Sequence, residues 1–124
     1  MINQILLYVG AVFIMLWGIA HLFATKGVVT GFGNISEDNK NIITMEWIIE
    51  GVALIFISVL VTTVTIIDHS NPVSTAVYWV TFGGLNTLSV VALSTGFKVN
   101  FLPFKLCPII LTSSSILVLL GILL

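Results

Sequence analysis

Four apolar stretches, each long enough to cross a bilayer, constrain this 124-residue chain more than any other feature. An α-helix rises about 1.5 Å per residue, so about 20 residues span the roughly 30 Å of hydrocarbon. The stretches lie at about residues 3–24, 42–67, 73–95 and 106–124. Backbone in lipid must satisfy its own hydrogen bonds, as a helix does. The sequence therefore predicts one all-α domain over residues 1–124, an integral membrane four-helix bundle with antiparallel neighbours and short loops.

The composition excludes several classes of protein. Hydrophobic residues make up 58% of the chain and charged residues 7%, against about 25% charged in soluble domains. With four basic residues and a net charge of -1, the chain has no material for a nucleic-acid groove. Its single cysteine, Cys107, rules out a Cys-x-x-Cys redox pair. The first apolar stretch lacks a basic leader and a cleavage site, so we expect a retained helix.

The connections between the apolar stretches carry turn and capping signals. A polar pair followed by glycine at Thr25–Gly27 predicts the end of the first helix. Ser36, followed by two acids, is typical of a helix cap, so the loop over residues 25–41 is expected to be part-helical. Pro72 suits the first turn of the third helix. The glycine pair at 83–84 predicts a close approach between helix backbones.

The lysines predict the orientation of the chain in the membrane. All of them fall in the first and third connections, which lie on one side of a four-span protein. Positive charge concentrates in cytoplasmic loops. We therefore expect loops 25–41 and 96–105 to be cytoplasmic and both termini to be outside, in a bacterial inner membrane.

The stretch Glu46-Trp47-Ile48-Ile49-Glu50 places two acids one helical turn apart where the second apolar run begins. The first helix runs toward this side and the second away from it, so His21 and Glu50 lie at similar depth, about 5 Å inside the boundary. An acid inside a bilayer is costly and by default suggests function. A histidine beside a buried carboxylate can hold or pass a proton near neutral pH. We expect Glu50 to be buried against His21, Glu46 to lie at the entrance, and Trp47 to line a pocket.

Polar side chains on the other two helices reach the same half of the membrane. The predicted pocket is roofed by the glycine-rich first loop, and its ligand- or proton-binding residues are His21, Glu46, Trp47, Glu50, Asn86, Ser89 and Thr112. In an alternative of equal weight, the two acids sit in water at a helix N-terminus and the histidine is an interface residue. One histidine with two glutamates lacks a fourth ligand, so we predict no metal and no cofactor.

The run Leu16-Trp17-Gly18-Ile19-Ala20-His21-Leu22-Phe23, ending a first helix in a four-helix chain of this length, resembles the DoxX-like small bacterial membrane proteins. The resemblance covers one helix and the number of spans. It implies a small four-helix bacterial membrane protein.

These features lead to three hypotheses of function. The first is a protein that binds, and by extension transports, a small or lipophilic molecule at a polar pocket in the cytoplasmic half of the membrane, with proton linkage. The second is a membrane-embedded acid/base enzyme, isomerase-like, that acts on a lipid-like substrate through the same pair. The third is a non-catalytic subunit of a membrane complex. Expected partners are membrane lipid, the ligand and further copies of the chain, and not nucleic acid.

Overall fold

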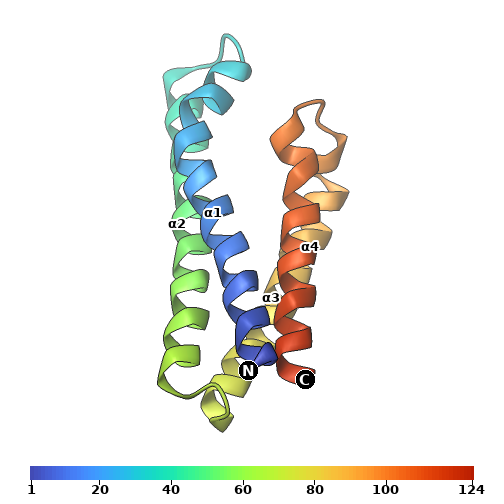
Figure 1. Ribbon diagram of the computed structural model, residues 1–124. Helices are drawn as coiled ribbons and strands as arrows, with labels where there is room; N and C mark the ends of the chain where they lie inside the picture. Colours follow the sequence, from blue (N-terminus) through green and yellow to red (C-terminus); the bar gives the residue numbers. More distant parts are fainter.

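The computed structural model describes all 124 residues and contains only helices (Figure 1). The four long helices and one short 3-10 turn are α1 (Ile2–Gly31), α2 (Glu37–Asp68), α3 (Pro72–Ser94), η1 (Gly96–Lys98) and α4 (Leu102–Leu123). Each long helix is long and apolar enough to cross a membrane. The chain is therefore an integral membrane protein with an all-α four-helix fold, as the sequence predicts.

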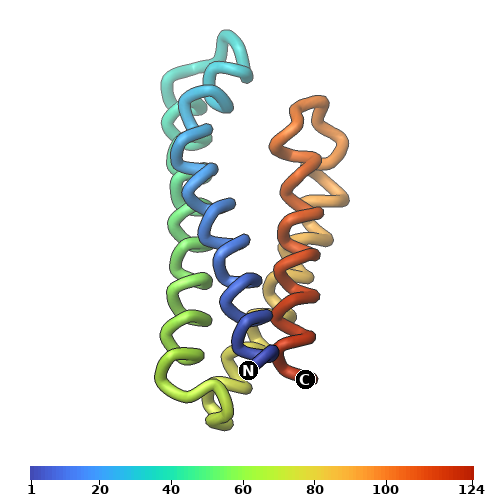
Figure 2. Tube along the Cα trace, viewed as in Figure 1, coloured from blue at the N-terminus to red at the C-terminus, as the bar shows by residue number.

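The helices form two close pairs, α1 with α2 and α3 with α4, and α1 also packs along α4 (Figure 1). The α2 and α3 helices contact each other much less than the other neighbouring helices do, and the two pairs diverge toward the end opposite the α2–α3 turn (Figures 1 and 2). Both termini and the α2–α3 turn lie at the end where the helices come together, which we call the closed end (Figure 1). The α1–α2 connection and η1 lie at the end where the pairs diverge, which we call the open end. The tight turn between α2 and α3 thus joins helices that separate along their length.

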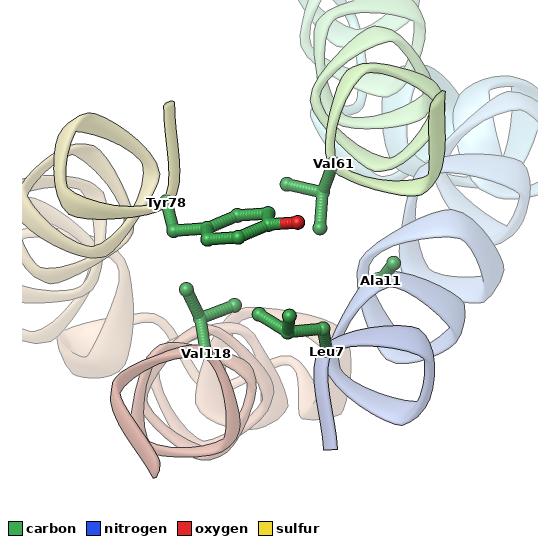
Figure 3. Close-up of a cluster of buried hydrophobic side chains, with 5 residues drawn as sticks. All are labelled: Leu7, Ala11, Val61, Tyr78 and Val118. Atoms are coloured by element: carbon green, nitrogen blue, oxygen red, sulfur yellow. The ribbon is translucent and has the colours of Figure 1, made fainter. Parts of the chain in front are cut away.

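Two apolar clusters hold the pairs together along the bundle axis. The cluster at the closed end draws on all four helices and comprises Leu7, Ala11, Val61, Tyr78 and Val118 (Figure 3). The second cluster lies nearer the open end and comprises Ile14, Leu54, Leu85, Cys107 and Leu111. The diverging ends of the helices lie beyond this second cluster.

Small hydroxyl side chains are buried between the helices, whereas large apolar side chains such as Phe56 face outward. Ser58 Oγ donates a hydrogen bond of 2.7 Å to the Ala11 carbonyl, which ties α2 to α1. Thr65 and Tyr78 share a hydrogen bond of 2.9 Å between α2 and α3. Lipid solvates apolar side chains as well as another helix does, so helix contacts in a membrane rely on small residues and hydrogen bonds.

The predicted starts of α2 and α3 are confirmed. Ser36 caps α2 and its side chain accepts a hydrogen bond from the Asn39 N–H. Pro72 occupies the first turn of α3, and Asn71 caps that helix by accepting from the Val73 N–H. These helix starts can be predicted from the sequence because a capping residue forms its hydrogen bond with a residue close to it in the chain.

The predicted end of α1 at Thr25–Gly27 is wrong, because the helix continues to Gly31. Val28, directly after the glycine, is buried with 4% of its surface exposed, and packing of this kind outweighs the roughly 1 kcal/mol cost of a helical glycine. The loop over residues 25–41 is accordingly reduced to a short connection between Gly31 and Glu37.

The close approach between helix backbones that is predicted at Gly83 and Gly84 is wrong. A Cβ atom on either glycine would meet nothing within 4 Å. The tight contact is instead between α1 and α2, where a Cβ on Gly18 would lie 2.8 Å from the Gly51 carbonyl oxygen and one on Gly51 would lie 2.9 Å from that of Gly18. These two positions bring the α1 and α2 backbones together beside the predicted site.

Candidate functional site

His21 on α1 and Glu50 on α2 meet, as their predicted depths require. His21 Nε2 lies 3.5 Å from Glu50 Oε1. The expectation that Glu50 is the buried partner is wrong, because its side chain is 47% exposed whereas that of His21 is 3% exposed. Glu50 lies on the side of α2 from which α3 has diverged, so no helix covers it.

The close contact between α1 and α2 at Gly18 and Gly51 determines how His21 lies against Glu50. A Cβ on Gly51 would come within 3.0 Å of His21 Cβ, so a larger residue there would push the imidazole away from α2. The absence of side chains at Gly18 and Gly51 lets His21 lie directly against the helix that carries Glu50. The imidazole stacks on the Trp47 indole with ring centroids 4.6 Å apart and planes 26° apart. Trp17 contacts its edge, with centroids 5.3 Å apart.

The hydrogen bonds of His21 determine what the pair can hold. His21 Nδ1 lies 2.9 Å from the Trp17 carbonyl oxygen, and a carbonyl only accepts, so Nδ1 carries a hydrogen. In a neutral imidazole Nε2 is then an acceptor, as is an ionised carboxylate oxygen. The contact between His21 and Glu50 is therefore attractive only when the pair holds one additional proton, on either residue.

A cavity of about 310 Å³ lies beside this pair, between the diverging helices. Its walls are mainly apolar and come from all four helices and η1. The edges of its opening are formed by half-exposed side chains, Glu50 on α2 and Leu88 and Val91 on α3. The helices α2 and α3 have diverged at this level (Figure 1), so the opening lies between these two helices.

Four of the predicted site residues do not line this cavity. Glu46 is exposed on α2. Asn86 donates to Ser115 Oγ and to the Phe82 carbonyl, so it links α3 to α4. Ser89 and Thr112 share a hydrogen bond of 2.6 Å in the same interface. Of the predicted site residues, only His21, Trp47 and Glu50 line the cavity. The predicted polar residues of α3 and α4 hold these two helices together.

The roof of the cavity comes from the third connection and not from the first loop. Thr95, Gly96, Pro103 and Phe104 close its end, and Phe104 contacts Trp47 with ring centroids 5.3 Å apart. The sequence places Phe104 among aromatic and lysine residues typical of a membrane interface, and this pattern conceals its inward orientation. Most of the residues assigned to the first loop belong instead to α1, which ends at Gly31, and to α2, which begins at Glu37.

Two further cavities adjoin this one. A cavity of about 110 Å³ lies on the far side of the His21–Trp47 stack and also contacts Trp17. A wider hollow of about 580 Å³ lies between the end of α1 and the third connection, and it shares Phe104 with the first cavity. His21 and Trp47 therefore line both the 310 Å³ and the 110 Å³ cavity.

No three His, Cys, Asp or Glu side chains lie close enough together to hold a metal ion. Cys107, the single cysteine, is buried and lines the first cavity.

Comparison with protein-family models, curated proteins and solved structures finds no match to this chain. The likeness of the first helix to the DoxX-like proteins stays a prediction.

Proposed function

We propose that the chain binds a small lipophilic molecule in the 310 Å³ cavity beside His21 and Glu50. The observation that carries this proposal is a mainly apolar cavity between the diverging helices that has one protonatable pair in its wall. Ligand sites combine mostly apolar walls with a few polar groups that fix orientation. Here the apolar side chains hold the body of the ligand and the His21–Glu50 pair meets its polar group.

Binding at this cavity is linked to protonation. Histidine is the side chain whose charge normally changes between about pH 5 and 8, and the contact between His21 and Glu50 requires one shared proton. A ligand that reorganises the pair therefore takes up or releases a proton. The same linkage would couple movement of the ligand across the membrane to a proton gradient.

We place the cavity in the cytoplasmic half of a bacterial inner membrane. Lys26 near the end of α1, Lys40 in α2, Lys98 in η1 and Lys105 in α4 all belong to the open end of the molecule, which also holds the cavity. Positive charges concentrate on the cytoplasmic side. This places both termini and the α2–α3 turn outside.

Quenching of tryptophan fluorescence tests the proposal, because Trp47 lines the cavity. Two brominated probes of matched shape are titrated into protein in lipid nanodiscs: neutral 1-bromo-4-neopentylbenzene and (4-bromobenzyl)trimethylammonium. Val91 lines the cavity and its neighbour Val90 does not, so Val91→Phe blocks the opening while Val90→Phe adds the same bulk beside it. Saturable quenching by at least one probe, lost in Val91→Phe and kept in Val90→Phe, supports the proposal. Its absence with both probes, or equal loss in both variants, refutes it.

A further inference from the structure

We propose that the ligand class of this cavity is the lipophilic cation, an amine or quaternary ammonium with an apolar body, which binds in exchange for the proton of the His21–Glu50 pair. This inference rests on the proposed function and specifies the chemistry of the same site.

The charge of the cavity wall favours a cation. Glu50 is the only carboxylate that lines it, and no lysine does. The other titratable groups in the wall are His21 on α1 and Cys107 on α4, while α3 and η1 contribute none. When the shared proton leaves, the carboxylate is the only full charge in an apolar cavity, where charges interact more strongly than in water. An anionic ligand would meet repulsion there, and a neutral ligand would leave this charge unpaired.

The Glu50 carboxylate can interact with a ligand in addition to His21. Its one partner within the chain is His21, at the long distance of 3.5 Å, and its side chain is 47% exposed at the opening. A carboxylate has about four lone-pair sites. A cation at the opening would therefore contact Glu50 without displacing any helix contact.

Aromatic side chains in the wall add to this preference. The Trp47 and Phe104 rings lie next to each other on two sides of the cavity, and aromatic faces attract cations within about 6 Å. The wall thus offers electron-rich groups and lacks a positive group other than a protonated His21.

Exchange with a proton follows from the charge balance of the pair. With its extra proton the pair is neutral, because it is either an imidazolium beside a carboxylate or an imidazole beside a carboxylic acid. Loss of that proton to water leaves one negative charge, which the bound cation neutralises. A cation and a proton therefore compete for the same site, and the affinity for the cation falls as the pH is lowered.

The two brominated probes separate this inference from the proposed function, because they differ only in a quaternary nitrogen against a carbon. We expect (4-bromobenzyl)trimethylammonium to bind the wild-type protein about tenfold more tightly than the neutral probe, after correction for partitioning into empty nanodiscs. Glu50→Gln should remove that tenfold preference and change the pH dependence of cation binding, because His21 is then the only member of the pair that can take up a proton. Glu46→Gln, one helical turn away and outside the cavity, is the matched control and should leave both unchanged.

Each outcome bears on one of the two proposals. Binding of the neutral probe to Glu50→Gln shows that the variant is folded with an intact cavity. Equal affinity of the wild-type protein for both probes, or a cation affinity that survives in Glu50→Gln, overturns the cation inference and leaves the proposed function standing. Failure of both probes to bind the wild-type protein refutes the proposed function, and the cation inference falls with it.

Discussion

Substitution of Gly51 by alanine tests whether the α1–α2 crossing is as close as the structure has it. A Cβ at this position would lie 2.9 Å from the Gly18 carbonyl oxygen, whereas ordinary contact begins at 3.4 Å. The two helices would have to separate by about 0.5 Å, because the nearest atom, the Gly18 carbonyl oxygen, belongs to the backbone of a long helix that cannot yield locally. Overpacking of this kind costs about 1–3 kcal/mol.

Gly83→Ala provides the matched control, because it makes the same chemical change in a helix where nothing lies within 4 Å. Both variants gain the same helix propensity, about 1 kcal/mol for alanine over glycine. The difference between their free energies of unfolding therefore measures the cost of the added Cβ at the α1–α2 contact alone. We expect Gly51→Ala to be less stable than Gly83→Ala by about 1–3 kcal/mol.

The assay is unfolding by sodium dodecyl sulfate in mixed micelles, followed by circular dichroism, with the wild-type protein in parallel. Gly18→Ala should behave as Gly51→Ala does, since its Cβ would lie 2.8 Å from the Gly51 carbonyl oxygen. The reasoning is refuted if Gly51→Ala is as stable as Gly83→Ala. That result would mean that α1 and α2 cross at a greater distance and that His21 is held against Glu50 by something else.

Two further predictions address the closed end of the bundle and the orientation. Tyr78→Phe removes the hydrogen bond to Thr65 and should lower the free energy of unfolding by about 0.6 kcal/mol in the same titration, and an unchanged value would contradict a role in stability. In a Cys107→Ala background, an impermeant maleimide should label Ser70→Cys in intact spheroplasts and Asn34→Cys only after lysis. The opposite pattern would invert the proposed orientation.

The sequence predicts the elements of this fold well because each signal is local. Hydrocarbon thickness fixes the length of the spans, and the helix starts marked by Ser36 and Pro72 depend on neighbours within one turn. The meeting of His21 with Glu50 follows from counting residues along two antiparallel helices. Rise per residue is a property of the helix itself, so depth can be predicted without knowledge of packing.

The rotation of each helix about its own axis could not be predicted in the same way. In a soluble bundle the apolar face marks the core, but lipid is as apolar as the core, and these helices are apolar on most sides. The sequence therefore predicts Asn86 and Thr112 in the pocket, whereas the structure places them in the α3–α4 interface. The burial of His21 in place of Glu50 has the same cause, since burial depends on where α3 diverges from α2.

The separation of α2 and α3 at the open end bears on whether a ligand would enter the cavity from lipid or from water. If the proposed ligand enters between these two membrane-spanning helices, it arrives from the bilayer, and its relevant concentration is its mole fraction in lipid. An apparent affinity in water would then rise with the partition coefficient of the ligand, even for ligands that make identical contacts with Trp47 and Glu50. Occupancy in a cell would likewise depend on the lipid composition of the membrane around the protein.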